Sequence, residues 1–167
     1  LHADAGSDKV ICIGESIQLE AEQNGLSYSW NNTGSLSDPF VADPIAFPTT
    51  STTYTVTVTY PTGCTDTDQV LVVVHALPIV EAGPVQPLCI GDTLQLQASG
   101  GLQYVWNADP TLSNPGLSNP MVYPLDTTTD FVTATDAQGC VNSDSTVVLV
   151  NLLPIVDAGS DTAKCGE

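Results

Sequence analysis

The five cysteines are the residues of this chain whose spacing bears most directly on chemistry. Three lie in a turn of the type Cys-Ile-Gly or Cys-Gly, and two directly follow the glycine of a different turn. They are Cys12, Cys89 and Cys165 in the first turn, and Cys64 and Cys140 in the second. The chain has no CxxC pair, and its histidines, His2 and His75, are not spaced as zinc ligands. Disulfide bonds are therefore the favoured role, and they form in an oxidising, extracellular compartment.

The 19 acidic residues are the second group with chemical potential, as ligands of calcium. Calcium binds carboxylate and carbonyl oxygens, and acids gather here near turns and linkers. Glu81 and Asp136 are the most interesting pair, and Asp4 and Asp157 are further candidate ligands. The same clusters include Asp8, Asp66, Asp68, Asp144 and Asp161. No EF-hand loop or calcium-binding nonapeptide occurs, and acids that keep a β-protein soluble explain the same pattern. Calcium is a hypothesis, and no other cofactor is indicated.

Composition excludes several classes of function. The chain has two lysines, no arginine and a net charge of −17, whereas nucleic-acid binding needs clustered cations that displace counterions. The longest apolar stretch, at residues 70–80, is far shorter than the roughly 20 residues that span a bilayer, so we expect no membrane insertion. We also expect that the chain is not an enzyme and has no catalytic residue, because neither His2 nor His75 has the partners of a catalytic triad.

The candidate residues recur because the chain consists of repeats. Matched positions are Tyr28 with Tyr104, Trp30 with Trp106, and Cys64 with Cys140, each 76 residues apart. Residues 4–19 match residues 81–96, and a third copy begins at Asp157. We predict a first repeat at residues 1–77, a second at 78–153, and the first strand of a third repeat or a linker at 154–167.

Each repeat has the pattern of short β-strands. Residues 53–60 alternate β-branched or aromatic side chains with threonine, and a Gly-containing turn leads to a second strand at 69–74, which predicts a hairpin. The second repeat has the same hairpin at 130–135 and 145–150. About seven strands per repeat predict an all-β fold of two tandem immunoglobulin-like β-sandwiches, end to end.

The four matched aromatic residues, Tyr28, Trp30, Tyr104 and Trp106, are predicted to lie in the two cores, on one face of a central strand. The alternative for the two indoles is a platform on which carbohydrate stacks.

Two disulfide arrangements fit this fold, and free thiols are a third interpretation. Pairing within repeats gives Cys12 with Cys64 and Cys89 with Cys140, and it leaves Cys165 unpaired. In a standard sandwich, however, these two turns lie about 20 Å apart, at opposite ends of a strand, whereas the Cα atoms of a disulfide lie at most about 7 Å apart. The turn of one repeat would then face the hairpin of the next, and Cys12 would bond to Cys140.

The combination of DAG, ICIG, Tyr-x-Trp, Pro-Thr-Thr, Tyr-x-Val-x-Val and Gly-Cys resembles the tandem Ig-like or PKD-like repeats of very large secreted Bacteroidetes surface proteins. Those include gliding-motility-associated adhesins exported by the type IX system. The resemblance implies a secreted or cell-surface location and a structural or adhesive role. It also suggests O-glycosylation after aspartate, for which Thr93, Thr127 and Ser145 are candidates, with a further match at residues 161–163.

The sequence therefore predicts a non-catalytic structural or adhesive repeat of an extended extracellular surface protein or filament. Its expected partners are neighbouring repeats of the same protein, and surface polysaccharide or other cells. Two alternatives stay open. One is a carbohydrate-binding module appended to a secreted enzyme, and the other is a filament subunit that polymerises by strand exchange.

Overall fold

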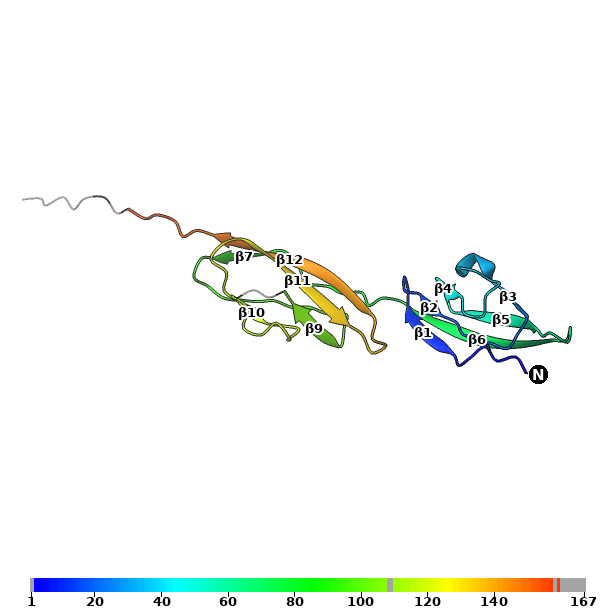
Figure 1. The fold of residues 1–167 in the computed structure, drawn as a ribbon. Coiled ribbons are helices and arrows are strands. Elements are labelled where there is room, and N and C mark those ends of the chain that lie inside the picture. The colour runs from blue at the N-terminus through cyan, green and yellow to red at the C-terminus, as the bar shows by residue number, and fades with distance from the viewer. Residues whose placement is uncertain (1, 108–109, 158, 160–167) are drawn as a thin grey trace, which may run out of the picture. The chain divides into compact units, whose positions relative to one another are not determined.

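The chain folds into two all-β units. The computed structural model describes residues 2–107, 110–157 and 159. One unit comprises Leu1–Pro78 with Thr135–Asn142, and the other comprises Ile79–Ala134 with Ser143–Glu167. Each unit contains a four-stranded and a two-stranded sheet (Figure 1). These paired sheets confirm the predicted class, two immunoglobulin-like β-sandwiches in tandem along the chain.

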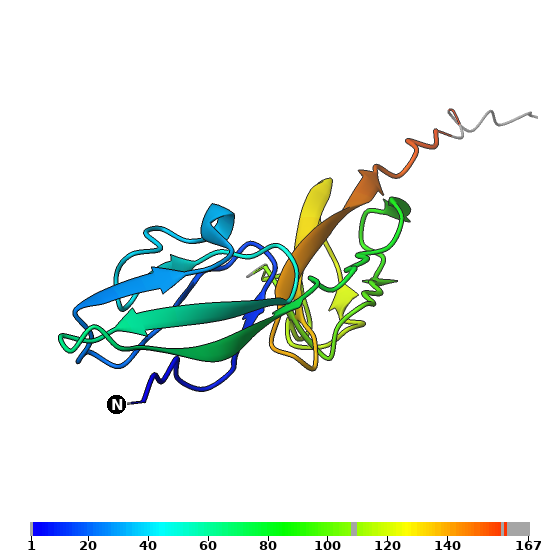
Figure 2. The ribbon, with the colours of Figure 1, turned by 90° about the vertical axis from the view of Figure 1, so that its right-hand side faces the viewer.

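The first unit is built around a long hairpin. Its larger sheet has the order β1-β6-β5-β3, in which β1 is parallel to β6 and the other pairs are antiparallel. The smaller sheet pairs β2 with β4. Figures 1 and 2 show β3, β5 and β6 side by side. The bounds are β1 Lys9–Cys12, β2 Ile17–Gln18, β3 Ser27–Trp30, β4 Ile45–Ala46, β5 Thr52–Thr59 and β6 Thr65–His75, with a short 3-10 helix at Thr33–Ser35.

The second unit repeats this plan. Its larger sheet has the order β7-β12-β11-β9, with β7 parallel to β12, and its smaller sheet pairs β8 with β10. The bounds are β7 Gln86–Cys89, β8 Leu94–Gln95, β9 Gln103–Trp106, β10 Met121–Val122, β11 Thr128–Thr135 and β12 Val141–Asn151. Nowhere in the described ranges is there a helix with the length and apolar character of a membrane span.

Alternation along the strands decides which side chains fill each core. On β5, Tyr54, Val56 and Val58 are completely buried, while the threonines between them point away from the core. On β11, Val132 and Ala134 take the corresponding places. The two cores have no buried member in common, so each sandwich buries its own apolar face.

The alternation of apolar and polar side chains at residues 17–21 predicts a half-buried strand there, which is longer than the observed β2. β2 ends at Gln18, although Leu19 still donates its N–H to the carbonyl of Pro44 at 2.9 Å and Ala21 donates to Ala42 at 2.8 Å. Proline offers a carbonyl but no N–H, so the ladder continues through one-sided hydrogen bonds. β6 is longer than predicted, because its polar start, Thr65–Asp68, also pairs with β5.

Candidate functional site

The turn that carries Cys12 is fixed by the end of β1. Ile13 donates its N–H to the carbonyl of His75 at 2.8 Å, and Glu15 donates its N–H to the carbonyl of Cys12 at 3.0 Å. The Glu15 carboxylate in turn accepts the N–H of Cys12 at 2.8 Å. Gly14, with φ +91°, provides the left-handed conformation that reverses the chain. The cysteine is therefore held at a defined position beyond the sheet.

Cys140 lies at the tip of the β11–β12 hairpin. The Asp136 carboxylate accepts the N–H groups of both Gln138 and Cys140 at 2.9 Å, and the N–H of Asp136 bonds to the carbonyl of Cys140 at 3.0 Å. The side chain of Cys140 is completely buried. This tip, Thr135–Asn142, clusters with the first unit rather than with the second.

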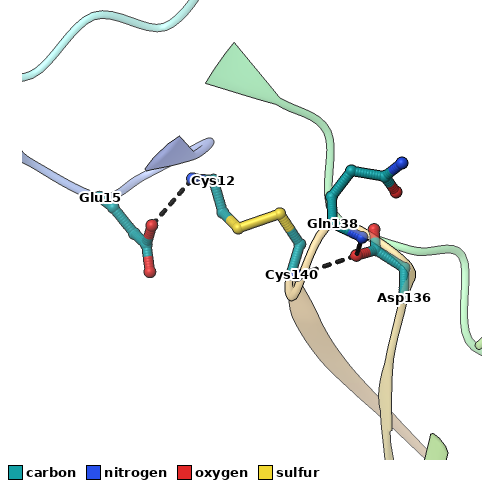
Figure 3. The surroundings of a disulfide bond; sticks show 5 residues. All are labelled: Cys12, Glu15, Asp136, Gln138 and Cys140. Carbon is teal, nitrogen blue, oxygen red and sulfur yellow. Dashed lines mark hydrogen bonds between the residues drawn. A yellow bond between two sulfur atoms is a disulfide. The ribbon is translucent and has the colours of Figure 1, made fainter. Parts of the chain in front are cut away.

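Cys12 and Cys140 form a disulfide bond with their Cα atoms 5.6 Å apart (Figure 3), which lies in the usual range. The staggered pairing is therefore the one that the structure contains. Figure 3 shows Glu15 on the Cys12 side and Asp136 on the Cys140 side, each accepting the N–H of its cysteine. Two carboxylates thus brace the two turns that the disulfide joins.

The pairing within repeats is wrong for all four cysteines, since Cys64 and Cys89 are exposed free thiols. The reason is the register of β1. Cys12 lies opposite His75, at the last residue of β6, whereas Cys64 directly precedes the first. The 11 residues of β6 separate the two cysteines by about 35 Å at roughly 3.3 Å per residue. Cys165 lies outside the described residues.

The four candidate calcium ligands have other roles or stand alone. Asp136 braces the hairpin tip, and the carboxylates of Asp4 and Asp157 accept the N–H two residues further on, at 2.8 Å in each case. Glu81 is exposed, and its backbone bridges to Ser99. No group of three or more metal-ligating side chains occurs within the ranges that the structure describes. Calcium binding stays a prediction.

Three other acids hold the N-terminal segment of a repeat onto its long hairpin. Asp66 and Asp68 on β6 accept the N–H groups of the buried Ala3 and Ala5, at 2.9 and 2.8 Å. In the second unit Asp144 on β12 accepts the N–H of Ala82 at 2.8 Å. These acids were grouped with the calcium candidates, and this role was not predicted. The period-two spacing of Asp66 and Asp68 indicates that both lie on one face of a strand, but it does not identify their partners, which are 63 residues away.

These hydrogen bonds change how the carboxyls ionise. The N–H groups of Ala82 and Ser145 hold the pKa of Asp144 below its usual value. The N–H groups of Ala3 and Thr67 lower the pKa of Asp66, with a further contribution from His2, whose Nδ1 lies 3.5 Å from the carboxylate. Tyr60 shows the opposite effect, because burial and the nearby Glu22 raise the pKa of its phenol.

The prediction that the two tryptophans fill the cores is confirmed, but the prediction of a central strand is wrong, because β3 and β9 are edge strands of their sheets. Trp30 and Trp106 are each 2% exposed, and their Nε1 atoms donate to the carbonyls of Val41 and Leu117 at 3.0 and 2.9 Å. Tyr28 and Tyr104 pack against the edges of the two cores. Because burial covers both indoles, neither offers the open ring face on which a sugar would stack.

Two features of the surface bear on ligand binding. The candidate glycosylation sites Thr93, Thr127 and Ser145 are exposed, and Thr127 also accepts the N–H of Val150. The further match at residues 161–163 begins and ends outside the described residues. An open hollow of about 640 Å³ in the second unit is lined by both apolar and polar groups, from Glu81, Gly83, Pro84, Gln86, Gln97, Ala98, Ser99, Ser118 and Asn119.

No family model and no curated protein matches the chain. Among solved structures, extracellular domains 3–5 of Drosophila OTK are 14% identical with a TM-score of 0.44, over 87% of this chain and 59% of theirs. The fibronectin(III)-like modules of Clostridium thermocellum CbhA are 13% identical with a TM-score of 0.40, over 96% of this chain and all of theirs. A PKD domain from KIAA 1837 protein is 22% identical over 50% of this chain and 92% of its own, with a TM-score of 0.39.

Proposed function

We propose that this chain is a non-catalytic structural and adhesive segment of a repeated extracellular protein. The observation that carries the proposal is the Cys12–Cys140 disulfide. Disulfides persist in secreted and cell-surface proteins and are rare in reducing compartments. This one joins a turn of the first repeat to a hairpin tip of the second, so the repeats are connected covalently at a second place besides the main chain.

The mechanical consequence follows from the length of the closed loop. The disulfide spans a sequence separation of 128 residues, so tension applied to the two ends of the chain bypasses everything between Cys12 and Cys140. Even if both sandwiches unfold, that segment cannot extend. Fully stretched, those 128 residues would lengthen the chain by about 450 Å, at roughly 3.3–3.6 Å per residue. A segment with this property keeps a surface protein from lengthening under load.

Single-molecule stretching of the intact chain, held at its two termini, tests this role. We expect the oxidised chain to stop about 450 Å short of the extension that it reaches after reduction. The Cys64→Ser/Cys89→Ser double variant is the matched control, because it removes two thiols that form no disulfide, and it should behave like the parent chain. Equal extension with and without reductant would overturn the proposed structural role.

The adhesive part of the proposal draws on apolar side chains at matched positions of the two repeats. Val41, Ile45 and Phe47 beside β4 are 37%, 47% and 46% exposed, and Leu117, Met121 and Tyr123 beside β10 are 45%, 38% and 50% exposed. Exposed apolar groups are the usual basis of weak protein contacts. Their repetition favours binding by many weak contacts, whose combined strength grows with the number of copies presented.

Beads coated with the chain at graded densities test adhesion to one another and to polysaccharide-coated beads. We expect adhesion to rise more steeply than coating density, and to fall when Ile45 and Met121 are both replaced by serine. The matched control replaces Val10 and Val105 by serine, because these residues are 59% and 62% exposed and lie on other strands. Adhesion that is unchanged in the first variant, or equally reduced in the control, would contradict the proposed contact surface.

The hollow beside Glu81 favours a second candidate, a discrete carbohydrate-binding module. Its amide and hydroxyl groups, from Gln86, Gln97, Asn119, Ser99 and Ser118, are the kinds of group that bind sugar hydroxyls. A glycan array probed with the monomeric chain separates the two functions. Binding of a glycan to the monomer in solution, together with loss of that binding in the Gln97→Ala/Asn119→Ala variant, would favour the carbohydrate-binding module over the multivalent adhesive segment.

A further inference from the structure

The two free cysteines occupy the same positions in their repeats as the two that are bonded. Cys89 corresponds to Cys12, and Cys64 corresponds to Cys140. The bonded pair is covered, with Cys140 completely buried and Cys12 half-buried, whereas Cys64 and Cys89 are both exposed. Each exposed thiol therefore lies where its counterpart meets a partner.

The turn that carries Cys89 has the same backbone geometry as the turn that carries Cys12. Ile90 donates its N–H to the carbonyl of Asn151 at 2.9 Å, and Asp92 donates to the carbonyl of Cys89 at 3.0 Å. The matching bonds of the first turn are 2.8 and 3.0 Å long. Gly91 has φ +90°, against +91° at Gly14. Cys89 is thus presented beyond its sheet in the way that Cys12 is.

The hairpin tip that carries Cys64 likewise matches the tip that carries Cys140. Tyr60 donates its N–H to the carbonyl of Cys64 at 2.9 Å, and Gly63 donates to the carbonyl of Tyr60 at 2.8 Å. The equivalent bonds at Asp136 and Gly139 measure 3.0 and 3.3 Å. The side-chain braces differ, since Tyr60 stands at the position of Asp136, but the backbone that positions the sulfur is retained.

We propose that Cys89 and Cys64 are complementary halves of a second staggered disulfide, and that a second copy of this chain supplies the missing half. Cys89 of one copy bonds to Cys64 of the next, as Cys12 bonds to Cys140 within the chain. Because each copy offers the two halves at two different places, the contact is head to tail, and repeated contacts build an open chain or a closed ring of copies.

The bond forms by thiol–disulfide exchange with a small-molecule disulfide such as oxidised glutathione. One thiolate attacks that reagent and becomes a mixed disulfide, which releases one reduced thiol. The second protein thiolate then attacks the mixed disulfide at the protein sulfur and releases the other. Two protein thiols have lost two electrons and two protons, and one molecule of the reagent has been reduced to two thiols.

Effective concentration and charge repulsion decide the conditions under which separate copies should join. Within the chain the linker gives the partner turns an effective concentration in the millimolar range, an advantage that separate copies lack. A net charge of −17 on each copy also opposes association, and salt screens that repulsion over a Debye length of about 8 Å at 0.15 M. Assembly should therefore increase with protein concentration and with salt.

The test uses the full chain in a Cys165→Ser background, so that Cys64 and Cys89 are the only unpaired cysteines in the sequence. Cys64→Ser and Cys89→Ser are prepared separately, and peptide mapping checks that each retains the Cys12–Cys140 bond. Each variant is oxidised alone and in an equimolar mixture, and the products are analysed on non-reducing gels and by mass spectrometry. Both substitutions are at exposed positions, so the variants should fold like the parent.

In the mixture we expect a disulfide-linked dimer with a Cys89–Cys64 bond, in about tenfold excess over each homodimer. Random pairing already gives a twofold excess, so the remaining factor of about five corresponds to about 1 kcal/mol of preference. The chain with both thiols should form a ladder of multimers. Random collision of thiols would instead make the mixed dimer only half of all dimers, and the yield of dimer would not depend on which thiol each copy carries. That distribution, or a chain with both thiols that stays monomeric, would overturn the proposal.

Discussion

Loss of the Cys12–Cys140 bond should lower the free energy of unfolding by about 4 to 5 kcal/mol. A sequence separation of 128 residues gives a loop-closure contribution of about 4.9 kcal/mol at 25 °C. If the first repeat unfolds while the second stays folded, the freely moving part of the loop is roughly half as long. The logarithmic dependence on length then reduces the figure by only about 0.6 kcal/mol. The expected loss is therefore similar whichever repeat unfolds first.

Denaturant titration of the parent chain, with and without reductant, measures this loss. Each repeat has one tryptophan, so Trp30→Phe and Trp106→Phe report on the second and the first repeat separately by fluorescence. The Cys12→Ser/Cys140→Ser variant should reproduce the effect of reductant, and Cys64→Ser/Cys89→Ser should leave the curve unchanged, because its thiols are exposed and unbonded. Superimposable curves for the oxidised and the reduced parent chain would show that the disulfide does not contribute this stability.

Three smaller perturbations test the surrounding packing. Tyr60→Phe should stabilise the chain by about 1 kcal/mol and raise its melting temperature, because the buried phenol has no hydrogen-bond partner among the described residues. A lower melting temperature would contradict this expectation. Gly100→Ala should destabilise the second unit by at least about 1–2 kcal/mol, since φ is +93° and the new Cβ would overlap the Ile79 carbonyl; an unchanged denaturation midpoint would contradict it. Asp144→Asn should lower the melting temperature at neutral pH, and the difference from the parent chain should disappear below about pH 4. The reason is that a carboxyl whose pKa is lowered by folding stabilises the folded state above its usual pKa of roughly 3.9, and this effect is lost as the carboxyl is protonated. A gap that does not depend on pH in thermal melts would exclude that explanation.

The sequence was informative wherever side-chain alternation determines burial. The β5 segment was predicted from alternating threonine and apolar residues, and Tyr54, Val56 and Val58 are indeed buried there. Trp30 and Trp106 fill equivalent places in the two cores, as their matched positions predicted. Strand ends were less predictable, because β2 stops where its partner is the Pro-rich connection, and proline lacks the donor that completes a ladder.

The cysteine pairing could be narrowed from the sequence but not decided. The choice depends on which end of β6 lies beside Cys12, and that is a property of the parallel β1–β6 register. A parallel pairing brings residues far apart in sequence to one end of the sheet, and no local pattern encodes it. The bracing of Ala3, Ala5 and Ala82 by aspartates was missed for a similar reason, since acceptor and donor are 62 or 63 residues apart.

Non-reducing peptide mass mapping of the purified chain tests the central claim most directly, because the proposed function depends on which cysteines are joined. Before the protein is oxidised or concentrated, we expect a linked peptide that contains Cys12 and Cys140, with Cys64 and Cys89 recovered as alkylated thiols. Linked peptides that join Cys12 to Cys64, or Cys89 to Cys140, would show that each repeat closes its own disulfide and would overturn the proposed function.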